Sequence, residues 1–180
     1  MRVITGLAKG KRLVTREGTD VRPTTERVKE ALFSILQFDL EGRRILDLFA
    51  GSGQLGIEAL SRGAASAVFV DSSSQSIKVI QQNLLNTGLG QNAQVVCSDF
   101  ASYLAGNTGT FDIVFLDPPY RKGLLEQALP LVAPRLNAGG SLVCEHPKGT
   151  ELPPEAGPLT RVRTYSYGQV LISLYRGEAL

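Results

Sequence analysis

Residues 44–56, RILDLFAGSGQLG, decide the fold. The run opens with apolar residues typical of a buried strand. Gly51, Gly53 and Gly56 then allow a sharp turn and the close approach of a ligand before a helix begins. A strand, a glycine-rich turn and a helix in this order are typical of nucleotide-binding α/β proteins. No Lys-Ser or Lys-Thr pair follows the glycines, so the run is not a P-loop.

Asp47, the last residue before this turn region, bears on the kind of ligand. The glycine spacing by itself is compatible with a dinucleotide-binding site. A carboxylate at this place repels a pyrophosphate, however, and attracts the cationic amino group of S-adenosylmethionine. Asp47 therefore favours S-adenosylmethionine as the cofactor.

Acidic residues close four apolar runs of the chain, at Asp47, Asp71, Asp99 and Asp117. One Asp at a strand end is usually a helix cap or a loop residue. Four such residues at one edge of a parallel sheet indicate a binding site, because ligands of these sheets bind beyond the carboxyl ends of the strands.

Two of these acids have neighbours that suit parts of a nucleoside. Asp71 is followed by a serine cluster beginning at Ser72, which suits a ribose diol. Asp99 is followed by Phe100, and the pair suits the amino group and the ring of adenine. We therefore expect the cofactor's adenosine between these two strand ends.

Asp117-Pro118-Pro119-Tyr120 closes the apolar run 111–116, FDIVFL. The prolines fix two φ angles and lack N–H groups, which leaves carbonyls free to accept hydrogen bonds from an amine. An aromatic ring at Tyr120 can stack on a flat base. The motif therefore predicts methylation of an amino nitrogen, and the alternative is a proline turn after a buried strand.

Apolar runs and helical stripes alternate along the chain. A helix is predicted over 24–38, and the final segments 159–163 and 169–175 form a predicted antiparallel hairpin joined through 165–168. Continuous apolar strands separated by helices predict a parallel sheet covered on both faces. The strands of this sheet are predicted near 44–48, 67–71, 94–98, 111–116 and 140–145.

The chain resembles the class I S-adenosylmethionine methyltransferases, and within them the bacterial RsmD-type enzymes that methylate guanine N2 in 16S ribosomal RNA. The resemblance covers nearly the whole chain. It rests on RVITG at 2–6 with KGKRL at 9–13, RPTTERVKEALF at 22–33, DLFAGSGQLGIEALSRGA at 47–64 and DPPYRKG at 117–123.

The resemblance implies a Rossmann-like α/β fold with a mostly parallel seven-stranded sheet, helices on both faces and an antiparallel C-terminal hairpin. It implies one domain over 1–180, in which a basic hairpin extension, 1–22, precedes the catalytic core, 23–180. The implied catalytic residues are Asp117, Pro118 and Tyr120. The implied cofactor-binding residues are Asp47, Phe49, Gly51, Ser52, Gly53, Asp71, Ser72, Asp99, Phe100 and Asp117, with Arg22 and Thr24 over the methionine end.

Positive charge is concentrated near the ends of the chain, and residues 1–44 hold ten Lys and Arg against six Asp and Glu. A basic surface of this kind suits RNA phosphates, whereas the alternative for each segment is a solvated surface. The predicted RNA-binding residues are Arg2, Lys9, Lys11, Arg12, Arg121 and Lys122. The expected partner is 16S rRNA, within a small-subunit assembly particle, for a monomeric enzyme without a DNA substrate.

Composition excludes several classes of protein. The chain has 180 residues, of which 43% are apolar, and it has no run of the roughly 18 apolar residues that a membrane span needs. Cys97 and Cys144 lie in apolar runs and are predicted to be core residues, so neither a disulfide nor a metal site is expected. The predicted location is the cytoplasm. His146, the single histidine, is given no catalytic role.

Two other functions remain open from the sequence. One is methylation of adenine in nucleic acid or of a protein glutamine, although an Asn at position 117 is more typical of glutamine enzymes. The other is a non-catalytic RNA-binding factor of ribosome assembly, against which the intact set of strand-end acids and glycines argues.

Overall fold

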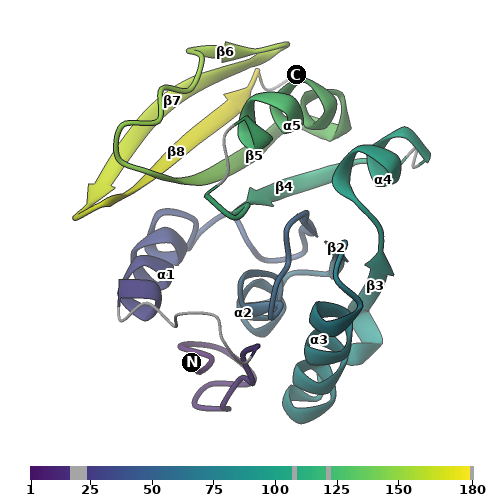
Figure 1. The fold of residues 1–180 in the computed structure, drawn as a ribbon. Helices are drawn as coiled ribbons and strands as arrows, with labels where there is room; N and C mark the ends of the chain where they lie inside the picture. Colours follow the sequence, from purple (N-terminus) through teal and green to yellow (C-terminus); the bar gives the residue numbers. More distant parts are fainter. Residues whose placement is uncertain (17–23, 107–108, 121–122, 179–180) are drawn as a thin grey trace.

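The computed structural model of the chain describes residues 1–16, 24–106, 109–120 and 123–178. It is built on an eight-stranded sheet in the order β3-β2-β1-β4-β5-β8-β7-β6, with helices on both faces (Figure 1). In the described part of the chain, none of the helices is both long and apolar enough to cross a bilayer.

The helices and strands alternate until β5, and three strands then follow one another. The elements are α1 (Thr24–Ile35), β1 (Arg44–Asp47), α2 (Gln54–Ser61), β2 (Ser66–Asp71), α3 (Ser74–Thr87), β3 (Ala93–Cys97), α4 (Phe100–Gly106), β4 (Phe111–Leu116), α5 (Leu124–Val132), β5 (Leu136–Pro147), β6 (Glu155–Ala156), β7 (Leu159–Tyr167) and β8 (Val170–Gly177).

Five strands, β1 to β5, run parallel, and β8, β7 and β6 extend the sheet in antiparallel pairing. The predicted Rossmann-like fold with a C-terminal hairpin is therefore confirmed. The sheet has one strand more than the seven expected, because the two-residue β6 pairs with the start of β7. A strand this short has no periodicity that a sequence could display.

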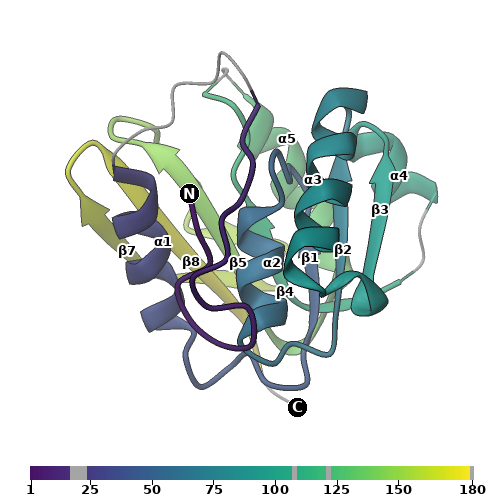
Figure 2. The ribbon, with the colours of Figure 1, turned by 90° about the horizontal axis from the view of Figure 1, so that it is seen from below.

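Each face of the sheet carries its own core (Figures 1 and 2). The helices α1, α2 and α3 cover one face, where Phe69 and Phe115 are fully buried. The helices α4 and α5 cover the other, where Leu46 and Val114 are fully buried. Burial on both faces explains the continuous apolar runs of the central strands.

The predicted bounds of several helices and strands were wrong. The helix α1 ends at Ile35 rather than residue 38, and β5 spans 136–147 rather than 140–145. The residues at 165–167, expected in the hairpin turn, belong to β7, and the turn lies at Gly168 and Gln169. Cys97, predicted to be buried, is exposed because β3 is the edge strand of the sheet, whereas Cys144 is buried in β5 as expected.

The N-terminal segment, residues 1–16, lies against α2 (Figure 2). The predicted hairpin is here a loop closed by a single antiparallel bridge between Arg2 and Arg12. Gly6 sits at a φ of 90°, and a Cβ there would meet the Ser61 carbonyl oxygen at 1.8 Å. Leu7 N–H donates to that carbonyl at 2.8 Å and Ala8 N–H donates to Ser61 Oγ at 2.9 Å. Only glycine permits this close approach to the helix.

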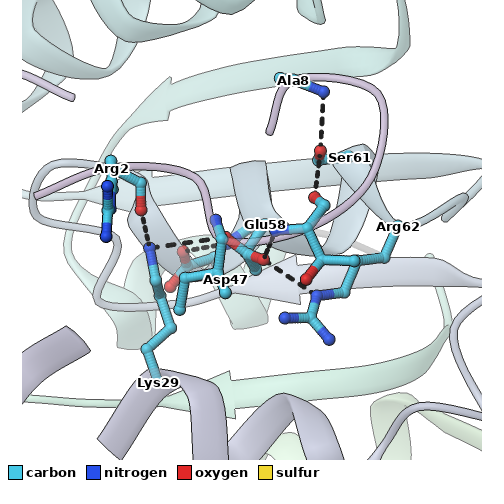
Figure 3. A network of polar contacts seen from close by, with 10 residues as sticks. Arg2, Ala8, Lys29, Asp47, Glu58, Ser61 and Arg62 are labelled. Atoms are coloured by element: carbon cyan, nitrogen blue, oxygen red, sulfur yellow. Dashed lines mark hydrogen bonds and ion pairs between the residues drawn. The ribbon is translucent and has the colours of Figure 1, made fainter. Parts of the chain in front are cut away.

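One buried carboxylate, Glu58 of α2, fastens this segment to the core (Figure 3). Its oxygens accept from Ile4 N–H at 2.9 Å and from Thr5 N–H at 3.0 Å. They also accept from Arg62 Nε at 2.9 Å. One side chain thus pairs two backbone N–H groups and a guanidinium inside the protein.

Lys29 connects α1 to the same network. Its Nζ lies 3.5 Å from Glu58 and donates to the Arg2 carbonyl at 2.7 Å. Burial lowers the pKa of Lys29, and the neighbouring Glu58 carboxylate opposes that shift. The N-terminal segment, α1 and α2 therefore share one buried ion network.

We predict that Glu58→Gln lowers the free energy of unfolding by on the order of 3–5 kcal/mol, because it leaves the Lys29 charge buried without its carboxylate. The measurement is urea denaturation followed by circular dichroism. Asp39→Asn is the matched control, because its ion pair with Arg176 at 3.1 Å is exposed on both sides and is expected to contribute below about 1 kcal/mol. Equal losses in the two variants would contradict the role given to Glu58.

Candidate active site

A cavity of about 700 Å³ opens at the carboxyl edge of the parallel strands, where β1, β2, β3 and β4 end. Its volume suits a nucleoside-sized ligand. The residues that line it are Met1, Thr15, Arg16, Leu48, Phe49, Gly51, Ser52, Gln54, Asp71, Ser72, Ser73, Ser76, Ser98, Asp99, Phe100, Asp117, Pro118, Pro119, Tyr120, Leu124 and Glu145.

Asp71, at the end of β2, fixes the glycine turn that follows β1. Asp71 Oδ2 accepts from Gly51 N–H at 2.9 Å, and its Oδ1 accepts from Ser73 N–H at 2.9 Å. Gly53 has a φ of 81° at the start of α2, and a Cβ there would lie 3.3 Å from Ile80. The turn and the start of α3 are therefore fixed to one carboxylate at the cavity wall.

Asp47 lies beneath this turn and is buried. Its Oδ2 accepts from Gly56 N–H at 3.0 Å, while Oδ1 has no hydrogen-bond partner within the described residues. Burial raises the pKa of Asp47 to about 7, the Gly56 N–H opposes the shift and the charge of Asp71 adds to it. Gln54 Oε1, at the start of α2, is the second buried oxygen there without a described partner.

Two aromatic rings form an apolar wall of the cavity. The ring centroids of Phe49 and Phe100 lie 5.3 Å apart with an interplanar angle of 46°. Asp99 stands beside them, exposed, and its Oδ1 accepts from Ser102 N–H at 2.9 Å. The Ser102 hydroxyl and its backbone N–H lower the pKa of Asp99. Asp99 is thus both a helix cap and a charged group at the cavity.

The Asp-Pro-Pro-Tyr segment closes the cavity beyond β4, and Tyr120 keeps 41% of its surface exposed. A second cavity, of about 500 Å³, also borders this segment. Pro118, Pro119, Tyr120 and Glu145 line both cavities. The two cavities therefore adjoin at this segment, and each is large enough for a small ligand.

The N-terminal segment supplies a wall that the sequence did not predict, at Met1, Thr15 and Arg16. Asn83 of α3 holds this wall in place. Its Oδ1 accepts from Val14 N–H at 2.7 Å, and its Nδ2 donates to the Val14 and Ser52 carbonyls at 2.9 and 2.8 Å. One amide thus joins the N-terminal segment to the glycine turn.

Most of the residues predicted to form the site meet in the first cavity. They are Phe49, Gly51, Ser52, Asp71, Ser72, Asp99, Phe100, Asp117, Pro118 and Tyr120. Asp47 and Gly53 lie at the glycine turn rather than in the lining. Arg22, Arg121 and Lys122 lie outside the described residues, and Thr24 is described only as the first residue of α1.

The predicted basic residues of the N-terminal loop, Arg2, Lys9, Lys11 and Arg12, are exposed. The loop tip binds Ser61, the last residue of α2, whereas Gln54 at the start of this helix lines the cavity. Seven steps of about 1.5 Å along the helix axis separate Gln54 from Ser61 by roughly 10 Å. The basic tip is thus one helix length from the cavity, whereas Arg16 lines it.

His146 lies outside both cavity linings and is buried in β5. Its Nε2 lies 2.8 Å from Ser173 Oγ, and burial lowers its pKa.

The family model described as "Conserved hypothetical protein 95" matches residues 1–176. The chain belongs to this family. It is 41% identical to the protein YlbH of Bacillus subtilis over 98% of each chain. It is 38% identical to "Ribosomal RNA small subunit methyltransferase D" of Escherichia coli K12, over 99% of this chain and 91% of the relative. The resemblance to the RsmD-type family is confirmed.

Solved structures of the family share the whole fold. The Escherichia coli protein yhhF superposes with a TM-score of 0.89 at 38% identity, over 100% of this chain and 99% of its own. The Haemophilus influenzae protein HI0767 gives 0.82 at 31%, over 98% of each chain. The protein SMU.776, solved in complex with SAH, gives 0.69 at 15% identity, over 84% of this chain and 49% of its own, and shares the fold alone.

We predict that Asp47→Asn changes the pH dependence of stability. The pKa of the carboxyl is about 3.8 in the unfolded chain and about 7 in the folded one, so the folded state binds more protons between these values and its stability falls as pH rises through that window. Asn has no such penalty. The melting temperature of the variant, relative to wild type, should rise by on the order of a few degrees from pH 5.5 to pH 8, measured by scanning fluorimetry. A difference that is the same at both pH values would contradict a buried, proton-binding Asp47.

Proposed function

We propose that this chain transfers the methyl group of S-adenosylmethionine to N2 of a guanine in 16S ribosomal RNA. The observation that carries the proposal is that an acid-lined cavity at the strand ends meets an Asp-Pro-Pro-Tyr segment. Support comes from the relative named as a ribosomal RNA small subunit methyltransferase, which matches nearly the full chain. Further support comes from SMU.776, which holds SAH on the same fold.

The residues at the first cavity fit this cofactor. Asp71 suits the ribose diol, and Asp99 with the wall of Phe49 and Phe100 suits adenine. Two buried oxygens, Asp47 Oδ1 and Gln54 Oε1, have no described hydrogen-bond partner. The amino group at the methionine end of the cofactor would supply the donors that these acceptors need. The bound cofactor supplies a methyl group activated by a sulfonium.

The Asp-Pro-Pro-Tyr segment orients the amine that accepts the methyl group. The carboxylate of Asp117 and the carbonyl of Pro118 accept hydrogen bonds from N2, and these bonds strengthen as the nitrogen gains positive charge in the transition state. Tyr120, partly exposed, stacks on the base. Holding the two reactants in line supplies much of the remaining acceleration. The base must leave its stack to enter, which favours a loop nucleotide.

The RNA follows a basic strip from Arg16 at the cavity towards Lys9 and Lys11 at the loop tip. Because the tip lies a helix length away, these residues contact phosphates several nucleotides from the target. Arg121 and Lys122 are proposed for the flanking phosphates. We further propose that residues 1–22 form an extension of a single domain whose core is 23–180. The enzyme would act in the cytoplasm as a monomer on a small-subunit assembly particle.

The direct test is radiolabelled methyl transfer from S-adenosylmethionine to small subunits and to naked rRNA from a strain that lacks the gene. We expect N2-methylguanosine as the product in nucleoside analysis. Label in adenine would show that the chain methylates the amino group of adenine, and label in protein would indicate an enzyme that methylates glutamine. Cofactor binding without transfer to any RNA would favour a non-catalytic assembly factor.

We predict that Asp117→Ala lowers kcat by about 100-fold or more, the range for loss of one group that stabilises developing charge. Tyr120→Phe is the control, because it keeps the ring that stacks and is expected to lower kcat less than about 5-fold. Single-turnover transfer at saturating RNA measures both. Wild-type kcat in Asp117→Ala would remove Asp117 from the mechanism.

A further inference from the structure

The second cavity borders the Asp-Pro-Pro-Tyr segment on the side away from the glycine turn. It is about 500 Å³ in volume, and Pro118, Pro119 and Tyr120 form the wall that it shares with the first cavity. A base that enters from this cavity meets the cofactor at the shared Asp-Pro-Pro-Tyr residues, where the amine and the methyl group can come into contact. The second cavity is therefore the candidate space for the target base of the proposed reaction.

Glu145 of β5 also lines both cavities, and among the described residues it is the carboxylate that the two linings share. The strand register pairs Cys144 of β5 with Leu116, the last residue of β4, so Glu145 follows beside Asp117. Neighbouring strands lie about 4.8 Å apart. Glu145 is half-buried, and by this register it is the neighbour of Asp117, the residue proposed to hold the reacting amine.

The chemistry of this wall selects among bases. The other charged residues that line the second cavity are Glu126 and Glu151, and its described lining contains no Lys or Arg. An ionised carboxylate accepts hydrogen bonds and donates none. Guanine presents two adjacent donors, N1–H and the N2 amine, on its Watson–Crick edge, whereas adenine presents an acceptor at N1 and cytosine an acceptor at N3. A carboxylate that faces N1 of the base, as proposed for Glu145, therefore pairs with guanine and repels the ring acceptor of adenine or cytosine.

We propose that Glu145 selects guanine by accepting a hydrogen bond from N1–H of the flipped base. The inference rests on the proposed function and deepens it. Glu145 reads the base edge, while Asp117 beside it holds the amine. The selection would therefore be made by a residue adjacent to the reacting atom, and a base without an N1 hydrogen would be rejected before transfer.

The test uses small subunits reconstituted with 16S rRNA in which 2-aminopurine replaces the target guanine, after the wild-type product has located that nucleotide. The analogue keeps the N2 amine but carries an acceptor at N1. We expect wild type to prefer guanine over 2-aminopurine by at least about 10-fold in kcat/KM. Glu145→Gln, whose amide can donate to N1, should lower the guanine rate and raise the ratio of 2-aminopurine to guanine rates at least about 10-fold.

Three variants complete the experiment. Glu145→Asp keeps the carboxylate and should keep the rejection of 2-aminopurine, which a merely structural role of Glu145 does not require. Glu126→Gln and Glu151→Gln are matched controls in the same cavity and should leave the ratio unchanged. Cofactor binding and melting temperature establish that each variant is folded. If Glu145→Gln does not fold, the inference is tested by the ratio of 2-aminopurine to guanine rates in Glu145→Asp and in the two control variants.

An unchanged ratio in a folded Glu145→Gln would overturn the inference. So would a shift of the ratio in Glu126→Gln or Glu151→Gln, or acceptance of 2-aminopurine by Glu145→Asp. These outcomes differ from a failure of the proposed function, because wild type must first methylate N2 of the natural guanine. A wild type that is active on guanine, with selection independent of Glu145, removes this residue alone.

Discussion

The parallel alignment of the central strands is the constraint on which the rest of the structure depends. Because β3, β2, β1 and β4 run in one direction at spacings of about 4.8 Å, their carboxyl ends meet at one edge. Acids separated by tens of residues in the chain, such as Asp71 and Asp117, thereby line one cavity. The covered faces of the sheet keep that edge rigid, since each face has a core of its own.

The N-terminal segment completes the site from outside the sheet, and its position depends on buried polar groups. The Glu58 carboxylate holds the N-terminal loop against α2. Asn83 holds the backbone at Val14, where the segment leaves this loop, beside the glycine turn. Loss of either group would leave buried charge or backbone unpaired, which costs more than the pairing itself contributes. The wall formed by Thr15 and Arg16 is thus coupled to folding as well as to binding.

The sequence predicted the sheet and most of the first cavity because these depend on local patterns. A buried strand followed by glycines, or by Asp-Pro-Pro-Tyr, can be recognised within about a dozen residues. The N-terminal wall was missed because Asn83 meets Val14 across 69 positions, and no local pattern records that contact. Glu145 was missed as a site residue because it ends an apolar run without a motif. Cys97 was placed in the core because an apolar run does not tell an edge strand from a central one.

The central claim is that the strand-end acids hold an adenosine-bearing cofactor in the first cavity and that the substrate base meets it at the Asp-Pro-Pro-Tyr segment, which lines both cavities. A crystal structure with S-adenosylhomocysteine tests this most directly. The account predicts the ribose at Asp71, the adenine beside Asp99 and the Phe49–Phe100 wall, and the sulfur directed at Pro118, with the second cavity empty of the ligand. A ligand in the second cavity, or one without contact to Asp71 and Asp99, would contradict it.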